Sequence, residues 1–257
     1  MNGAFYIGAT GLSAQERGLA VTANNITNLN TPGYKRAAIS FSELVATQRP
    51  SFEAMLANTG RSSILSGVAA DASARIFAQG ELRLTDSDLD IAIDGEGFIE
   101  LLGQNGETML WRGGTLTVNE DGYLAAANGM PLRGLITVPV GTTDLTIDRN
   151  GMIRAIVDGA PEPEEIGQIE LAMVQDSANM TSAGNAMFRP ASDSGVAVMM
   201  PGEDGAGSIV QGAIENSNVD LASEVVTLLL LQRGFAASSQ VVRAGDQLMA
   251  IANDLRR

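Results

Sequence analysis

The amino-acid sequence predicts an α+β fold, in which long N- and C-terminal helices form a coiled-coil-like pair with an antiparallel all-β domain inserted between them. Apolar residues recur every seven positions at both ends of the chain, as they do along one face of a helix. Between the ends, short alternating segments are separated by Asn-Gly and Asp-Gly pairs, which are typical of β-hairpins. We therefore expect a terminal helical assembly domain (1–40 and 216–257), an extended or mixed linker (41–75) and an antiparallel β domain (76–215).

The N-terminal helix is predicted from a seven-residue stripe that consists of Phe5, Leu12, Leu19 and Ile26, with Leu29 beside it. Small residues flank this stripe, which favours close contact with another helix over burial in a thick core. We expect the helix to end near residues 28–30, because Pro32 disfavours helical backbone in the residue before it. Residues 31–33 read Thr-Pro-Gly, which suits a type II turn.

Asn24 and Asn25 occupy the last turns of this helix, where asparagine has a poor helix propensity. They can simply help to end the helix. Because they adjoin Ile26 of the stripe, they can equally fix the register between two paired helices. The sequence supports both interpretations.

The C-terminal helix is predicted over residues 218–257 from a second stripe with the same spacing. The stripe consists of Leu221, Leu228, Phe235, Val242 and Met249, and it is widened by Val225, Leu231 and Leu248. Asp220 can cap the start of the helix by accepting hydrogen bonds from its first backbone amides. Only Gly234 and Gly245 weaken the helical pattern.

The middle of the chain is predicted to be antiparallel β structure built of short strands and hairpin turns. Turns are expected at the Asn-Gly and Asp-Gly pairs 105–106, 121–122, 128–129, 150–151 and 158–159. Strands are expected at 89–93, 98–101, 115–118, 123–125, 135–138, 145–147, 152–156, 168–174 and 208–214. We expect residues 190–207, which combine Gly, Pro and acidic residues, to form a mobile loop.

The composition argues against several classes of function. The chain has no Cys and no His, which removes disulfides, thiol chemistry, most zinc sites and the usual general base. A net charge of −14 argues against a nucleic-acid partner. We expect no enzymatic activity, no cofactor and no bound metal.

The negative charge is concentrated in the middle of the chain. Residues 1–40 sum to +2 and residues 216–257 to zero, so the middle carries the whole excess of −16. Near-neutral termini can pack against copies of themselves, whereas an acidic middle remains in solvent.

A cluster of carboxylates indicates a different function, that of a secreted carbohydrate-binding or hydrolysing β domain. The cluster consists of Asp86, Asp88, Asp90 and Asp94. The last three alternate with apolar residues, so we expect them on the solvent-facing side of a strand instead.

The sequence predicts no cleaved signal and no membrane insertion. The first ten residues lack the charged and apolar regions of a secretory signal. The longest apolar run, residues 225–231, is broken by Thr227 and is too short to span a bilayer.

Three parts of the chain resemble signatures of the bacterial flagellar basal-body rod protein family. Residues 23–28 read Ala-Asn-Asn-Ile-Thr-Asn and residues 30–36 read Asn-Thr-Pro-Gly-Tyr-Lys-Arg. Residues 90–98 read Asp-Ile-Ala-Ile-Asp-Gly-Glu-Gly-Phe, and residues 215–220 read Glu-Asn-Ser-Asn-Val-Asp. These segments follow the family's order over essentially the whole chain. One departure lies at residues 110–114, which read Leu-Trp-Arg-Gly-Gly where the family often has Tyr-Thr-Arg-Asp-Gly.

The resemblance implies a structural subunit of the rod, the drive shaft that transmits torque from the motor to the hook. The length and the single β domain favour a rod protein, distal before proximal, over a hook or hook-junction protein of the same family. The resemblance also implies type III export without a cleaved signal, a place in the periplasmic rod, and helical polymerisation. The implied partners are copies of the chain itself, other rod and hook proteins, and the surrounding rings.

We expect the subunit interface to be formed by both apolar stripes together with the two asparagines. The expected residues are Phe5, Leu12, Leu19, Asn24, Asn25, Ile26, Leu29, Leu221, Val225, Leu228, Leu231, Phe235, Val242, Leu248 and Met249.

Overall fold

The computed structural model describes residues 2–45, 66–103, 106–159, 162–175, 177, 180–191, 195–203 and 205–254. The chain divides into two compact units. We call the first the terminal unit (residues 1–26, 37–74 and 220–257) and the second the β unit (residues 27–36 and 75–219).

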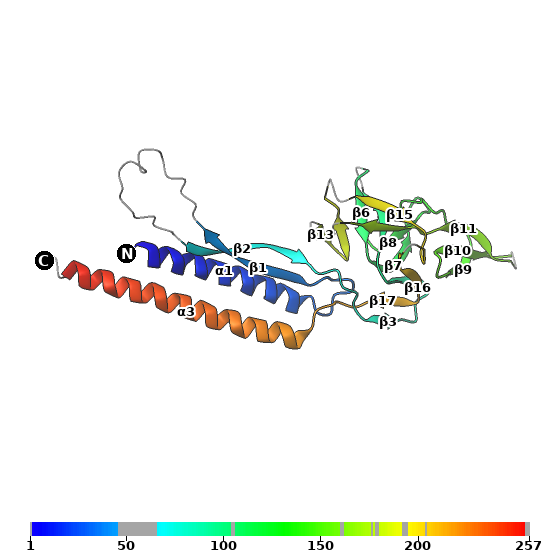
Figure 1. Ribbon diagram of the computed structural model, residues 1–257. Helices are drawn as coiled ribbons and strands as arrows, with labels where there is room; N and C mark the ends of the chain where they lie inside the picture. Colours follow the sequence, from blue (N-terminus) through cyan, green and yellow to red (C-terminus); the bar gives the residue numbers. More distant parts are fainter. Residues whose placement is uncertain are drawn as a thin grey trace, which may run out of the picture. The chain divides into compact units, whose positions relative to one another are not determined.

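The terminal unit contains both long helices, α1 (Asn2–Thr27) and α3 (Leu221–Asp254). Figure 1 shows the two helices side by side and running in opposite directions. The predicted helix at each end of the chain is therefore confirmed within the described residues. Its C-terminal member begins at Leu221, three residues later than expected, and residues 255–257 lie outside the description.

The terminal unit also contains the strands β1 (Ala37–Val45) and β2 (Ser66–Arg75), which form a two-stranded sheet. Residues 41–75 had no clear strand signal in the sequence, where we expected an extended or mixed linker. Residues 46–65 lie outside the described part of the chain.

The β unit consists of short strands, as the spacing of the turn signals predicts. They are β3 (Leu82–Leu84), β4 (Asp90–Asp94), β5 (Phe98–Leu102), β6 (Thr108–Trp111), β7 (Gly113–Val118), β8 (Leu124–Ala126), β9 (Thr142–Ile147), β10 (Met152–Val157), β11 (Glu164–Gln168), β12 (Leu171–Val174), β13 (Thr181–Gly184), β14 (Met187–Arg189), β15 (Val196–Met199), β16 (Ser208–Gln211) and β17 (Ala213–Glu215).

These strands form antiparallel sheets, whose orders are β13-β14-β6-β5-β12-β15, β16-β4-β7-β8, β11-β10-β9 and β17-β3. In two of these sheets the ends of the unit come together: β16 pairs with β4, and β17 pairs with β3. The last strands of the unit therefore close onto its first strands. Because these pairings join residues far apart in the chain, the unit is complete only when residues 208–215 are in place.

The apolar residues of the sheets meet in one large core and one smaller cluster. The large core includes Ile91, Ile93 and Ile99, each at most 1% exposed. In the smaller cluster, the rings of Phe77 and Phe188 lie edge to face with their centroids 5.0 Å apart. Such burial supplies most of the free energy that holds a β domain of this size together.

Several strand predictions are wrong in detail. Residues 135–138 form no strand, because Leu135 has a positive φ of 44° that a strand cannot accommodate, and only an isolated bridge at Thr137 remains. Conversely, β15 lies within residues 190–207, which we expected to be a loop. Short strands such as β15 carry too few residues for alternation to be recognised.

Two predicted turns are confirmed. The amide of Tyr34 donates to the carbonyl oxygen of Thr31 at 3.2 Å, and Gly33 has the positive φ of 65° that the third position of a type II turn requires. Gly151 has a φ of 82° in the Asn-Gly turn between β9 and β10.

Candidate functional site

The two terminal helices meet in an antiparallel contact that we call the helix seam, and glycines line it. The facing pairs from α1 to α3 are Gly8 with Val242, Gly11 with Ser238 and Gly18 with Leu231. A Cβ atom added to Gly8 would lie 2.6 Å from Cγ2 of Val242, and one added to Gly18 would lie 2.9 Å from Cδ2 of Leu231. Because these glycines have no side chain, the two helices can approach each other closely.

Of the two glycines of α3, Gly234 has the same role, because a Cβ atom added there would lie 2.8 Å from Nε2 of Gln15. One added to Gly245 would lie 3.4 Å from Cε2 of Phe5, which is an ordinary contact distance. In the sequence these glycines are weak points of the helical pattern. In the structure they are packing positions.

The predicted stripe residues are divided between the seam and the surface. Phe5, Leu231 and Val242 contact the opposite helix. Leu12, Leu19, Ile26 and Leu228 are half-buried. The exposed ones are Leu221, Val225, Phe235, Leu248 and Met249, at 45, 40, 40, 62 and 41%.

The remaining predicted interface residues lie elsewhere. Asn24 is exposed, whereas Asn25 is buried. Leu29 is half-buried and belongs to the β unit, because residues 27–36 group with it.

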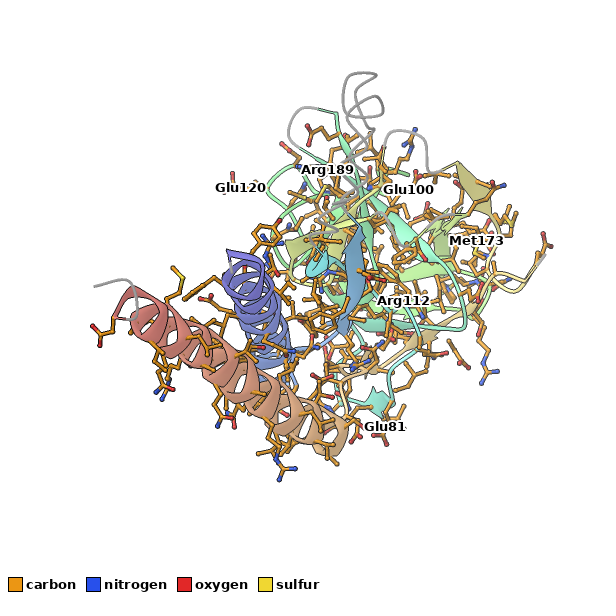
Figure 2. All side chains as sticks on the ribbon, turned by 60° about the vertical axis from the view of Figure 1, so that its left-hand side comes forward. Glu81, Glu100, Arg112, Glu120, Met173 and Arg189 are labelled. Atoms are coloured by element: carbon orange, nitrogen blue, oxygen red, sulfur yellow. The ribbon has the colours of Figure 1, made fainter. Side chains whose placement is uncertain are left out.

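α3 is apolar on more sides than its predicted stripe. With 3.6 residues per turn, Leu230, Val241 and Leu248 lie on the side of the helix opposite Leu221 and Leu228. Their side chains are 61, 48 and 62% exposed. Figure 2 shows side chains standing out from α3 along its length, away from α1. The expectation of a single apolar face is therefore wrong, because Leu248, which we assigned to the predicted stripe, lies with Leu230 and Val241 on a second face.

By length and composition alone, residues Leu221–Ile251 would pass as a membrane-spanning helix, with a mean hydropathy of 1.3. The run at residues 225–231, which contains six apolar residues and Thr227, understates this property, because further apolar residues follow along the helix. Since only 6% of the segment is buried within the chain, a large apolar surface remains to be covered.

Asn25 joins three elements of the terminal unit. Its Nδ2 donates to the carbonyl oxygen of Ala37 at 2.8 Å and to Oε2 of Glu224 at 3.3 Å. In return, the amide of Ala37 donates to Oδ1 of Asn25 at 3.0 Å. Asn25 and Glu224 are each 1% exposed. This contact between α1, β1 and α3 corresponds to the register-fixing interpretation of Asn25, since a buried amide is satisfied in only one alignment.

α1 also packs against the β1–β2 sheet. Nη1 of Arg17 donates to the carbonyl oxygen of Ala70 at 3.1 Å. A Cβ atom added to Gly67 of β2 would lie 2.9 Å from Oγ1 of Thr10. The first helix is thus held on one side by α3 and on another by a sheet that the sequence did not predict.

Asp220 caps α3 as predicted. The amides of Ala222 and Ser223 and the hydroxyl of Ser223 donate to its carboxylate. These hydrogen bonds, above all the one from the Ser223 hydroxyl, lower the pKa of Asp220 because they favour the charged carboxylate.

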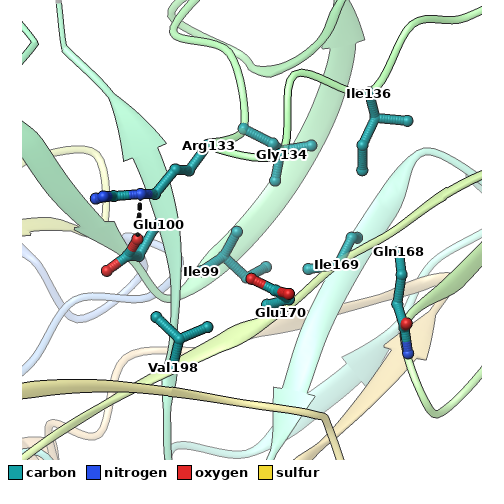
Figure 3. Close-up of a pocket in the computed structure, with 10 residues that line it drawn as sticks. Ile99, Glu100, Arg133, Gly134, Ile136, Gln168, Ile169, Glu170 and Val198 are labelled. Carbon is teal, nitrogen blue, oxygen red and sulfur yellow. Dashed lines mark ion pairs between the residues drawn. The ribbon is translucent and has the colours of Figure 1, made fainter.

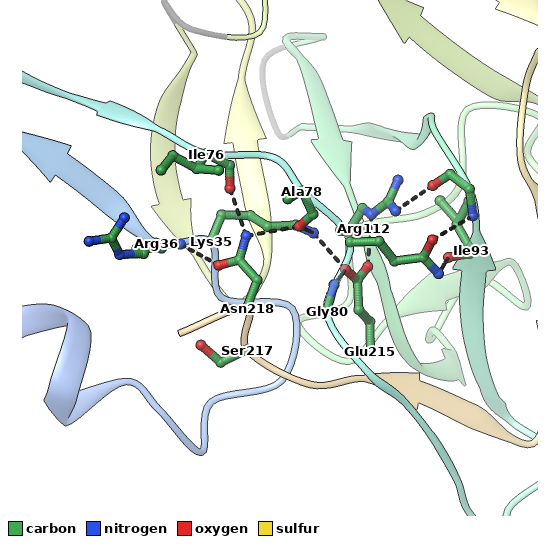
Figure 4. A network of polar contacts seen from close by, with 12 residues as sticks. Lys35, Arg36, Ile76, Ala78, Gly80, Ile93, Arg112, Glu215, Ser217 and Asn218 are labelled. Atoms are coloured by element: carbon green, nitrogen blue, oxygen red, sulfur yellow. Dashed lines mark hydrogen bonds and ion pairs between the residues drawn. The ribbon is translucent and has the colours of Figure 1, made fainter. Parts of the chain in front are cut away.

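The signature segment 30–36 meets residues 215–219 of the signature segment 215–220 within the β unit, around a buried carboxylate (Figure 4). Oε1 of Glu215 accepts a hydrogen bond from Nζ of Lys35 at 2.5 Å, and Oε2 accepts one from Nε of Arg112 at 2.8 Å. The three side chains are 1 to 4% exposed. We call this group the buried ion cluster. Sequence reasoning missed it, because charged residues so far apart in the chain give no local signal.

Burial lowers the pKa of Lys35, and the nearby Arg112 lowers it further, while Glu215 offsets part of this effect. The remaining donors of the cluster are satisfied by backbone. Lys35 also donates to the carbonyl oxygen of Ala78 at 3.0 Å, and Arg112 donates to those of Gly95 and Gly97 at 2.5 Å each.

Figure 3 shows a cavity of about 120 Å³ in the β unit, lined by Ile99, Ile136, Ile169 and Val198 among others. At its edge, Nε of Arg133 lies 3.1 Å from Oε2 of Glu100. This volume holds a few water molecules rather than a drug-sized ligand. Its lining therefore gives no specific indication of a substrate.

The predicted carboxylate cluster is dispersed. Asp90 is buried, contrary to expectation, and accepts a hydrogen bond from Oγ1 of Thr115 at 2.6 Å. Asp94 is exposed and accepts one from Nε2 of Gln79 at 3.2 Å. Within the described residues, no group of three or more Asp and Glu side chains is placed to hold a metal ion.

Three family models match the chain. Residues 5–35 match "Flagella basal body rod protein", residues 92–155 match "Flagellar hook protein FlgE/F/G D1 domain", and residues 210–255 match "Flagellar basal body rod FlgEFG protein C-terminal". The matched segments include most of α1, all of α3 and all three members of the buried ion cluster.

Curated relatives are similar over nearly the whole length. The chain is 35% identical to "Flagellar basal-body rod protein FlgG" of Caulobacter vibrioides over 255 residues, which is 96% of this chain and 97% of the relative. It is 31% identical to the protein of the same name from Borreliella burgdorferi, over 99% of this chain and 98% of that one. The match in Agrobacterium fabrum is 33% identical, over 97 and 98%. The chain belongs to the flagellar basal-body rod protein family, whose members are structural components of the flagellar basal body.

Proposed function

We propose that this rod subunit polymerises helically through its terminal unit, and that the polymer transmits torque from the motor to the hook as the distal part of the rod. The observation that carries the proposal is the apolar surface of α3, which its own chain leaves exposed on two sides. A helix that is apolar all round is stable when other helices surround it. Copies of the same chain would surround it. If the contact between copies is head-to-tail and does not close into a ring, the copies form a filament.

We propose further that α1 and α3 form a coiled-coil-like pair. Gly11, Gly18 and Asn25 recur every seven residues along α1, and each faces or contacts α3. The residues that meet them, Ser238, Leu231 and Glu224, recur at the same interval. This spacing is that of a supercoiled antiparallel pair.

We assign assembly to the terminal unit and solvent exposure to the β unit. Compared with the boundaries expected from the sequence, residues 27–36 then belong with the β unit and residues 41–74 with the terminal unit. The charge supports this division, because the residues of the terminal unit sum to −1 and those of the β unit sum to −13. Copies packed through this part of the chain would repel one another.

The remaining expectations follow from membership of the family. The subunit would be exported without a cleaved signal, would lie in the periplasmic rod, would contact other rod and hook proteins and the surrounding rings, and would catalyse no reaction. The subunit interface would include the exposed residues of both faces of α3 and the exposed Asn24 of α1.

Phe235→Asp tests the proposal. Because Phe235 is 40% exposed in the single chain, we expect the purified monomer to melt close to the parent temperature. Rods seen by electron microscopy, and swimming of the cells, should be lost, because a charge would be buried between copies. Gln240→Glu, which adds a negative charge at an exposed polar position of the same helix, is the matched control. Normal rods built from the Phe235→Asp chain would refute assembly through this face.

A further inference from the structure

Three chain segments are tied together at one edge of the β unit. They are residues 33–36, 75–80 and 215–218, and we call them the clamp (Figure 4). The amide of Ile76 donates to the carbonyl oxygen of Arg36 at 2.9 Å, and the amide of Gly33 donates to that of Glu215 at 2.7 Å. Backbone therefore joins the first segment to each of the other two.

Asn218 binds the first two segments at once. Its Oδ1 accepts the amide of Arg36 at 2.7 Å, while its Nδ2 donates to the carbonyl oxygens of Ile76 and Ala78, each at 2.8 Å. One amide side chain thus satisfies three backbone groups that belong to two distant segments. Only Asn and Gln carry a side-chain amide with both a donor nitrogen and an acceptor oxygen, and the side chain of Gln is longer.

The buried ion cluster locks the same segments from inside. Besides its two cations, Glu215 accepts the amide of Gly80 at 2.7 Å, so its carboxylate holds the second segment as well. Within the described residues, Glu215 is the carboxylate with which both Lys35 and Arg112 form an ion pair. Pulling Glu215 away would leave two buried cations without a counter-charge, which is far more costly than breaking an exposed pair.

Each segment of the clamp continues directly into the terminal unit. Residue 36 precedes β1, residue 75 ends β2, and residues 215–218 lead through residue 219 into α3. We propose that the clamp is the mechanical coupling through which force passes between the β unit and the terminal helices. This inference rests on the proposed torque-transmitting function. Because the three segments are hydrogen-bonded to each other, tension on one of them is shared by all three. A single segment is therefore not pulled away from the β unit on its own.

Hydrogen exchange of the full-length soluble chain tests whether the clamp is one unit. The reporters are the amides of Gly33, Arg36, Ile76 and Gly80, all of which donate within it. Glu215→Gln should speed their exchange by about 100-fold or more, while exchange within α1 and α3 is unchanged. The matched control is Glu165→Gln, whose partner Arg154 and own side chain are 37 and 60% exposed. Equal exchange in the two variants would overturn the clamp.

A double variant distinguishes the loss of charge neutralisation from general unfolding of the chain. Adding Lys35→Met to Glu215→Gln removes one of the two unpaired cations, so exchange should be slower than in Glu215→Gln alone. Faster or unchanged exchange in the double variant would show that Glu215 acts by something other than neutralising the buried cations, and would overturn the electrostatic lock.

Swimming under load tests the mechanical role. Asn218→Ala removes three hydrogen bonds of the clamp and leaves both the ion cluster and the surfaces of α3 intact. We expect rods of normal length, normal swimming in dilute medium, and a loss of speed relative to the parent as viscosity rises. Parental speed at every viscosity, together with faster exchange at Arg36, would overturn the coupling while leaving the rod function standing. The rod function itself fails only in the separate Phe235→Asp experiment.

Discussion

At the scale of single residues, short polar side chains fix the points where elements of this chain begin and meet. Asn25 binds the backbone at the start of β1, Asn218 binds two segments of the clamp, and Asp220 holds the first turn of α3. Each replaces a hydrogen-bond partner that the backbone lacks at that point. The signature segments of the family therefore contain residues with local structural roles.

The cap at Asp220 predicts a specific dependence on pH. Because its folded pKa lies below the ordinary value of 3.8, its contribution to stability is complete above that value and is lost as pH falls through the folded pKa. Asp220→Asn keeps an acceptor oxygen but cannot gain a proton. The difference in melting temperature between parent and variant should therefore be constant near neutral pH and change on acidification. Ser223→Ala, which removes the strongest donor, should move that change to higher pH. A difference that is the same at every pH would contradict this account.

At the scale of elements, the sequence predicts both helices well and their contact poorly. The seven-residue stripes and the cap at Asp220 are local signals, and they survive in the structure because long periodic helices depend on local pattern. The seam itself consists largely of Gly8, Gly11, Gly18 and Gly234, which contribute nothing to a hydrophobic pattern. Close packing of a glycine against a side chain of the partner helix cannot be predicted until both helices are placed.

The β elements show the same limit. Strands next to Asn-Gly and Asp-Gly turns, such as β9 and β10, are predicted because the turn supplies a local signal. β1 and β2 lie next to no such signal, and β15 has four residues only. Asp90 was expected in solvent because of its alternation with apolar neighbours. It is buried because a strand covered on both faces also buries the polar side of the alternation.

Gly18→Leu tests the importance of the glycine seam. A side chain there meets Leu231, whose Cδ2 would be 2.9 Å from the new Cβ, so the helices must separate. We expect a loss of roughly 1–3 kcal/mol in the unfolding free energy of the terminal unit, as for other overpacked contacts. Urea unfolding followed by helical circular dichroism measures it. Ala20→Leu, which adds the same bulk on an exposed side of α1, is the control and should cost little. Equal stability of the two variants would mean that the seam is not closely packed in solution.

At the scale of the whole molecule, the chain separates two tasks along its length. The parts that come from its ends are near neutral and carry apolar helix surface, and the part between them is acidic and encloses its own core. Composition predicts this division, because charge and apolar content can be summed without knowing the fold. Composition does not predict that residues 27–36 belong to the β unit. Their place there depends on the ion pair between Lys35 and Glu215, which are 180 residues apart in the chain.

Limited proteolysis of the dilute monomer tests this exchange of segments. We expect cleavage of the terminal helices first, because their apolar surfaces lack the partner copies that would protect them. The resistant core should contain residues 75–219 and should retain a peptide that spans residues 27–36, bound through the Lys35–Glu215 pair and the backbone hydrogen bonds of the clamp. Mass spectrometry of the core under native and then denaturing conditions detects that peptide. In the Glu215→Gln chain the peptide should dissociate, because two buried cations then lack a counter-charge. A core that lacks residues 27–36 in the parent would refute their place in the β unit, and uncut helices in the dilute monomer would refute the need for neighbouring copies.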